Sequence, residues 1–126
     1  MASHVYVIEG VPRSGKNSMR LAVNRRTGRR FTLKSKAASA WLASAELQLI
    51  AQRGRRRPLA GPCEVSIVAY QKSDVCDLDN MIALCLDGIK GIVIEDDSAV
   101  CRIVAAKEID RARPRIEVTI RQFEAA

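Results

Sequence analysis

The sequence predicts an α+β fold in which a mixed, mostly antiparallel sheet packs against two main helices. Two segments carry apolar residues at a helical period of about 3.6, and several others are β-rich or alternate apolar and polar residues. The 126 residues contain no internal repeat or long linker, which suits one domain spanning residues 1–126. Because only 4% of the residues are aromatic, the core must consist mainly of Val, Ile, Leu and Ala.

The first 33 residues are predicted to form a strand and a basic hairpin. Residues 4–11 are β-rich and end before a proline, and residues 13–17 read as a polar loop. Residues 21–24 and 29–33 then flank the sequence Arg-Arg-Thr-Gly. A turn signal between two β-prone segments is typical of a hairpin, and the tip of this one carries positive charge.

A long helix is predicted next. Ser35 can cap a helix that runs to about Arg53, and Gly54 ends it. Residues 55–58 form a charged connector to the following element. The stripe expected to face the core consists of Ala38, Trp41, Leu42, Ala45, Leu49 and Ala51 or Gln52.

The second half of the chain is predicted to contain three strands and a shorter helix. Residues 63–71 alternate in polarity, with Cys63, Val65, Ile67 and Ala69 on one face. A helix is expected from about residue 78 to 90, because Leu78, Met81, Ile82, Cys85 and Ile89 share a face, and Gly91 can terminate it. Residues 100–106 and 115–121 are the last two predicted strands.

The charges of the chain are segregated along the sequence. The first 57 residues contain 13 basic and two acidic side chains, whereas residues 58–101 contain two basic and eight acidic ones. The net charge of the whole chain is +7. This division suits a protein that binds a polyanion with one part and performs metal chemistry with another.

Several protein classes are disfavoured by the sequence. Cys63, Cys76, Cys85 and Cys101 form no Cys-x-x-Cys pair, which argues against a zinc knuckle and a thioredoxin-like motif. No apolar run approaches the roughly 18 residues of a membrane span, and we find no export signal. We therefore expect a cytoplasmic protein with reduced thiols and no membrane partner.

Residues 10–17 partly match the phosphate-binding P-loop pattern. Gly10, Gly15 and Lys16 occupy its glycine and lysine positions after a predicted strand. Asn17 stands where a Ser or Thr should bind magnesium, and a hairpin follows in place of the long helix. We expect no nucleotide cofactor, and we interpret this segment as a cationic loop that contacts a nucleic-acid backbone.

Four aspartates form the strongest candidate site. Asp77 and Asp79 lie at a predicted junction between a strand and a helix, and Asp96 and Asp97 lie on a later turn. Carboxylate oxygens are ligands that Mg²⁺ prefers. Crowded carboxylates repel one another, so at least one is expected to have a raised pKa in the absence of metal.

A structural interpretation of the same aspartates is also open. Asp77 can cap a helix, Asp79 suits the first helical turn, and Asp96 with Asp97 can be ordinary turn residues. The basic remainder of the chain favours the metal interpretation, because metal-assisted phosphodiester cleavage needs an acidic site within a cationic protein.

The segment 77–100 closely resembles the signature of RusA-type Holliday-junction resolvases. It begins a helix with Asp-Leu-Asp-Asn and ends in an Asp-Asp-Ser turn, and the surrounding elements agree in order. The resemblance implies a RusA-like fold and a homodimeric, Mg²⁺-dependent endonuclease, with Mn²⁺ as an alternative ion, that cuts four-way DNA junctions by paired nicks in recombination and repair. It also implies that Asp77, Asp79 and Asp97 are catalytic metal ligands and that Asp96 is a further ligand.

The chain departs from the family pattern at one position. The family usually has a lysine four residues after the second aspartate, and this residue is Ala83 here. Lys90 and Lys72 are the candidate substitutes for this catalytic cation. A catalytically weakened protein that only binds junctions is therefore the alternative function.

Arginine and lysine side chains of the first 57 residues are the expected DNA contacts. Arginine suits bidentate contacts with phosphate, which position a protein on DNA without reading its sequence. The expected phosphate contacts are Arg13, Lys16, Arg20, Arg25, Arg26, Arg29 and Arg30, with a second patch at Arg55, Arg56 and Arg57.

Overall fold

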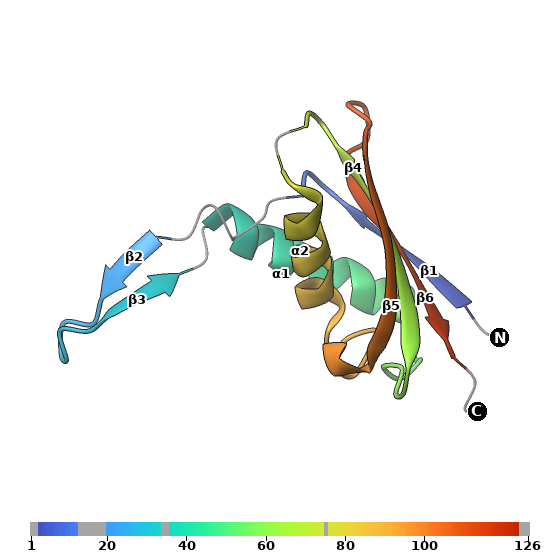
Figure 1. Ribbon diagram of the computed structural model, residues 1–126, viewed down its shortest axis with the longest axis horizontal. Coiled ribbons are helices and arrows are strands. Elements are labelled where there is room, and N and C mark those ends of the chain that lie inside the picture. The colour runs from blue at the N-terminus through green and yellow to red at the C-terminus, as the bar shows by residue number, and fades with distance from the viewer. Residues whose placement is uncertain (1–2, 13–19, 34–35, 75, 124–126) are drawn as a thin grey trace.

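The computed structural model describes residues 3–12, 20–33, 36–74 and 76–123, and it confirms the predicted α+β fold (Figure 1). The four-stranded sheet has the order β1-β6-β4-β5, in which only the β4–β5 pair is parallel. Its strands are β1 (Ser3–Glu9), β6 (Arg115–Gln122), β4 (Cys63–Gln71) and β5 (Val100–Ile109). The other elements are α1 (Lys36–Arg53), α2 (Leu78–Ile89), the short helix η1 (Asp97–Ala99) and the hairpin β2 (Arg20–Val23) and β3 (Arg30–Leu33).

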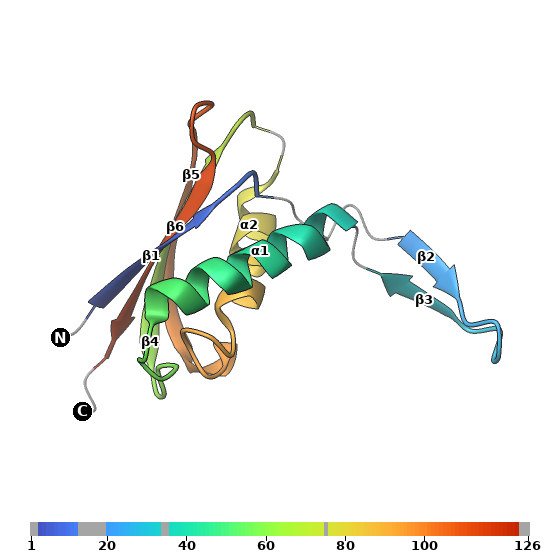
Figure 2. The same cartoon turned by 180° about the vertical axis from the view of Figure 1, so that it is seen from behind.

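Both long helices cover the same face of the sheet, and the core lies between them and the strands (Figures 1 and 2). Along β4 every second residue is buried, as the alternation predicts. From α1 the core receives Ala38, Trp41, Ala45 and Leu49. Where the helices approach each other, Gly88 lies against the ring of Trp41, and a Cβ atom at residue 88 would make ordinary van der Waals contact with Cζ3 at 3.4 Å.

Two details of the prediction are wrong. Ala51 and Gln52 were expected to continue the apolar stripe of α1, but both are exposed. Neither is needed in the core because α1 crosses the sheet edge at this point, where Gln52 contacts the backbone of β1. The strand predicted to end at residue 106 continues to Ile109, since its backbone stays paired with β4 as far as Gln71.

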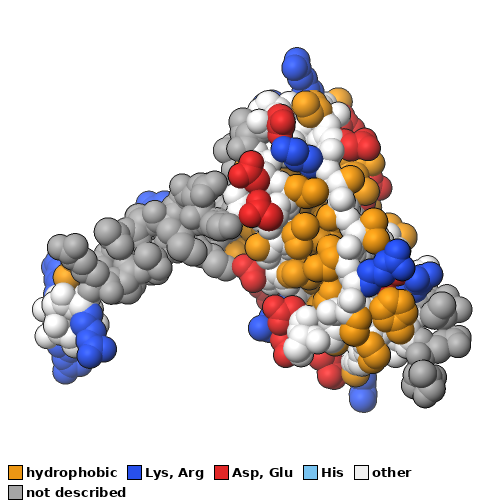
Figure 3. Space-filling model, in the orientation of Figure 1, with side chains coloured by type: hydrophobic (Ala, Val, Ile, Leu, Met, Phe, Trp, Pro, Cys, Tyr) orange, Lys and Arg blue, Asp and Glu red, His pale blue; other side chains and the backbone are white. Residues whose placement is uncertain are grey.

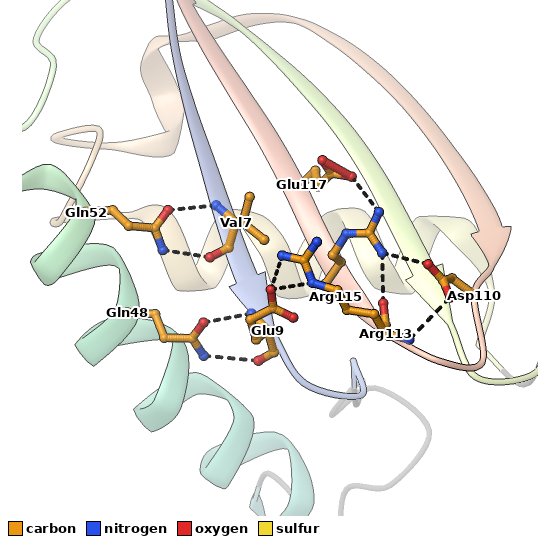
Figure 4. Close-up of polar contacts among 8 residues, drawn as sticks. All are labelled: Val7, Glu9, Gln48, Gln52, Asp110, Arg113, Arg115 and Glu117. Carbon is orange, nitrogen blue, oxygen red and sulfur yellow. Dashed lines mark hydrogen bonds and ion pairs between the residues drawn. The ribbon is translucent and has the colours of Figure 1, made fainter.

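The outer edge of β1 is covered by two glutamines of α1 (Figure 4). The side chain of Gln52 accepts a hydrogen bond from the amide of Val7 at 2.8 Å and donates one to its carbonyl at 2.7 Å. Gln48 makes the same pair of contacts with Glu9, at 2.7 and 3.0 Å. At Val7 and Glu9 these side-chain amides take the place of a neighbouring strand, so this part of the edge is covered.

The sheet face opposite the helices is polar over β6 and β4. The guanidinium of Arg115 donates to Asp110 at 2.9 Å and to Glu117 at 3.1 Å (Figure 4). It also stacks on the ring of Tyr70, 3.8 Å from the ring centre. We call this face the open face, and the other the helix-covered face.

Candidate functional site

The loop between β4 and α2 is held by one buried glutamine. Gln71 ends β4 and is only 3% exposed. Its side chain accepts a hydrogen bond from the amide of Cys76 at 3.2 Å and donates one to the carbonyl of Cys76 at 3.3 Å. These two bonds fix the backbone next to Asp77, and thus the point at which α2 begins.

Asp77 and Asp79 lie at the N-terminal end of α2 with exposed side chains. Asp77 occupies the N-cap position, but its carboxylate makes no capping hydrogen bond. The structural interpretation of Asp77 as a helix cap therefore lacks the bond that would stabilise the helix. Its oxygens, which are hard ligands, fit a divalent cation at this end of the helix.

Lys90 brings a cation to the other acidic pair. It occupies the C-cap of α2, and its ammonium lies 3.4 Å from a carboxylate oxygen of Asp96 and 3.8 Å from one of Asp97. The pKa of Asp96 is lowered, first by a hydrogen bond from the Ser98 hydroxyl and also by Asp97 and Lys90. The rise in pKa predicted for at least one of the four carboxylates therefore does not fall on Asp96, and for the group it stays a prediction.

The two aspartate pairs lie at opposite ends of α2. The helix has 12 residues, which corresponds to an axis of about 18 Å. Within the described ranges, no three His, Cys, Asp or Glu side chains are close enough together to hold one metal ion. A shared metal site made by Asp77, Asp79, Asp96 and Asp97 therefore stays a prediction.

Lys107 is a second lysine near the aspartates, and sequence reasoning missed it. Its ammonium lies 2.7 Å from a carboxylate oxygen of Asp74. The pKa of Lys107 is raised, mainly by this hydrogen bond, with a contribution from the charge of Asp77. Lys107 and Asp74, together with Gln71, Glu108 and Ile109, line a pocket of about 140 Å³ beside the loop. A strand predicted to extend past residue 106 would have included Lys107, but its contact with Asp74 is not visible in a local pattern.

The basic residues fall into two groups at opposite ends of α1. The tip of the β2–β3 hairpin exposes Arg25, Arg26 and Arg29, as predicted. Asn24 shapes this tip, since its side chain accepts hydrogen bonds from the amides of Arg26 and Thr27. In both views the hairpin projects away from the sheet and its helices (Figures 1 and 2).

The second basic group follows α1. Arg55 and Arg57 are exposed, whereas Arg56 donates a hydrogen bond to the hydroxyl of Tyr6 at 3.1 Å and lies over its ring. The 18 residues of α1 separate the two groups by an axis of about 27 Å. The predicted contacts Arg13 and Lys16, and the side chains of Arg20 and Arg30, lie outside what the structure describes.

Comparison with known families agrees with this arrangement. Residues 12–121 match the family described as Endodeoxyribonuclease RusA. The chain belongs to the RusA family. RusA membership implies an endodeoxyribonuclease with Holliday-junction resolvase activity and a branched DNA substrate. A search of curated proteins gave no match.

The departure of this RusA protein from the family pattern lies on the surface of α2. Ala83, at the position where the resemblance implies a lysine, is exposed. Lys72 is also exposed, on the loop before Asp77. Lys90 and Lys107 provide cations at the two aspartate pairs instead.

Asn80, next to Asp79, is 3% exposed, and its side-chain oxygen has no hydrogen-bond partner within the described part of the chain.

Neither described helix is both long enough and apolar enough to span a membrane.

Proposed function

We propose that this RusA protein is a Mg²⁺-dependent endonuclease, active also with Mn²⁺, that resolves four-way DNA junctions as a homodimer. Its role is in recombination and repair in the cytoplasm, and residues 1–126 act as one nuclease domain. The observation that carries the proposal is the family match over residues 12–121, which includes both aspartate pairs.

The chain divides the work between its acidic and basic groups. The aspartates would hold divalent metal, Asp77 and Asp79 at one end of α2 and Asp97 with Asp96 at the other. Metal bound there would supply a Lewis acid for the scissile phosphate and lower the pKa of a water. Lys90 orients Asp96 and Asp97 by its ion pairs. The arginines of the hairpin bind phosphates and hold the junction against the protein.

A synthetic four-way junction tests the proposal. The protein should nick the junction when Mg²⁺ is present, should not nick it in EDTA, and should leave a linear duplex of the same sequence intact. Asp79→Asn should cut nicking by orders of magnitude and keep junction affinity, because a ligand is removed together with a negative charge near phosphate. Asp87→Asn, on an exposed turn of the same helix, is the matched control. Full nicking by Asp79→Asn would contradict the proposal.

Ala83 favours a second candidate function, a protein that binds junctions without cutting them. Such a protein would bind the junction tightly, yet it would not nick it with Mg²⁺ or Mn²⁺. Asp79→Asn would then leave every measured property of the protein unchanged except a small gain in affinity.

A further inference from the structure

The two edge strands of the sheet, β1 and β5, differ in what covers their outer backbone groups. At the β1 edge, the side-chain amides of Gln48 and Gln52 cover the backbone of Val7 and Glu9. At the opposite edge β5 pairs with β4 on one side, and within the described ranges no strand pairs with its other side. An open edge of ten residues is a template for pairing with another chain.

Apolar side chains line this open edge on both faces of the sheet. Ile103 lies on the helix-covered face, opposite Val65, and Val104 lies on the open face, opposite Ser66. They are 41% and 47% exposed, and Ile109 is 58% exposed. In Figure 3 hydrophobic side chains form a band over the region where β5 lies in Figure 1. A contiguous apolar band of this kind marks an interaction surface.

We propose that β5 pairs antiparallel with β5 of a second copy of this chain, so that the two sheets join across a two-fold axis. The inference rests on the proposed homodimer and specifies its interface. A two-fold axis perpendicular to the sheet makes the contact isologous, so both copies use the same surface. The register of the two β5 strands is then defined by the one residue that lies at the axis, directly opposite its own copy.

The charges of β5 select the register. A bulge between Cys63 and Glu64 disturbs the start of β5, and the strand is regular from Arg102 to Ile109. With the axis at Ala105, Arg102 lies opposite the partner's Glu108 on the open face. Because of the two-fold symmetry, this pair of opposite charges forms twice in the dimer. Within the described chain neither residue forms an ion pair.

The neighbouring register fits less well. With the axis at Val104, Arg102 lies opposite the partner's Ala106, and neither ion pair can form. The axis at Ala105 also uses the whole regular segment from Arg102 to Glu108 and places Val104 beside the partner's Ala106. Opposite charges that face each other across strands stabilise pairing, and like charges oppose it.

A charge-exchange cycle tests this interface without DNA. Sedimentation should give a dimer of the native chain at tens of micromolar. Arg102→Glu and Glu108→Arg should each weaken dimerisation about tenfold or more, because each creates two like-charge pairs. The variant with both changes should return to within about threefold of the native value. Arg55→Glu, which makes the same change of charge at an exposed residue outside β5, between α1 and β4, should have no effect.

Cross-linking gives a second readout that tolerates weak association. In a Cys101→Ser background, Arg102→Cys with Glu108→Cys should give a covalent dimer with a short bismaleimide. Either cysteine alone should not, since Arg102 and its own copy would lie about 20 Å apart at 3.3 Å per residue. Circular dichroism and thermal unfolding confirm that each variant is folded.

Three results would overturn the interface: a monomer at all accessible concentrations, single charge variants that dimerise normally, or a double variant no better than the single ones. None of these measurements depends on catalysis. An intact β5 dimer that fails to nick a junction counts against the proposed function alone, whereas nicking by a dimer with another interface counts against this inference alone.

Discussion

Gln71 shows how a single buried side chain can set the position of a catalytic loop. Its two hydrogen bonds to Cys76 join the end of β4 to the start of α2. The backbone groups of Cys76 cannot find equivalent partners if the amide is removed, because this part of the loop is half buried. We therefore expect Gln71 to act by positioning Asp77.

Gln71→Leu should lower the free energy of unfolding by about 1–3 kcal/mol, since it leaves two buried polar groups unpaired. Nicking of a junction should fall more than tenfold at a temperature where the variant is still folded. Urea unfolding and single-turnover nicking provide the two measurements. Gln122→Leu removes one exposed hydrogen bond to Ala60 and should change neither quantity noticeably. Native nicking by a folded Gln71→Leu protein would show that the loop is positioned by other contacts.

The missing family lysine makes a second prediction at this scale. Because Lys90 is the cation in contact with Asp96 and Asp97, Lys90→Ala should slow nicking about tenfold with little change in junction affinity. Adding Ala83→Lys to that variant should restore part of the rate, since position 83 is exposed and accepts a lysine. Lys72→Ala is the control and should keep the native rate. The opposite pattern, a slow Lys72→Ala and a normal Lys90→Ala, would assign the cation to the loop.

At the scale of elements, α1 both builds the core and closes a sheet edge. The same helix presents Trp41 and Leu49 to the core and Gln48 and Gln52 to the backbone of β1. Replacing both glutamines by alanine should lower the free energy of unfolding by about 1–3 kcal/mol, at roughly 1 kcal/mol or less for each hydrogen bond removed.

The same glutamine variant should also associate through its exposed β1 edge, because unpaired strand edges invite pairing. Light scattering and urea unfolding measure the two effects. Glu46→Ala with Leu47→Ala, on the exposed side of the same helix, should be stable and unchanged in mass. If the glutamine variant behaves like this control, the amides do not protect the edge.

Periodicity predicted these elements well, because burial follows helical and strand periods. It predicted α1, β4 and the hairpin to within a few residues. It could not predict Gln48 and Gln52 as edge partners, since that role depends on which strand the chain brings beside α1. Lys107 was missed for a similar reason: its contact with Asp74 joins two elements that are 33 residues apart.

The candidate site was predictable in composition but not in geometry. The aspartates were identified from their residue types and spacing. That α2 separates the two pairs, and that Lys90 contacts one of them, depends on how the turn after the helix folds back.

The β2–β3 hairpin is the element that we expect to bind the DNA backbone. Replacing Arg25, Arg26 and Arg29 together by glutamine should weaken binding to all sequences. It should also reduce the slope of log affinity against log salt by up to about 0.9 for each phosphate that the protein no longer neutralises. Titrations at several salt concentrations measure the slope, and Arg111→Gln on the β5–β6 turn is the control. An unchanged slope would place the DNA surface elsewhere.

At the scale of the whole molecule, paired cleavage requires two sites in one complex. A dimer should convert a supercoiled plasmid with an extruded cruciform directly to linear DNA, because both strands are nicked before release. Equal amounts of the native protein and Asp79→Asn should form mixed dimers that nick one strand, so nicked circles should accumulate. Linear product in unchanged proportion would indicate that each chain acts alone.

The pairing of β1 with β6 has a consequence for how the chain folds during synthesis. Ser3 lies opposite Arg121, so β1 leaves the ribosome long before β6, and their ladder can form only after β6 has been made. Pairings between residues so distant in sequence are slow to form. The glutamines of α1 are made much earlier than β6, and they can hold Val7 and Glu9 in the meantime. The hydrogen bonds of Gln48 and Gln52 seen in the folded protein thus offer the nascent β1 a temporary partner.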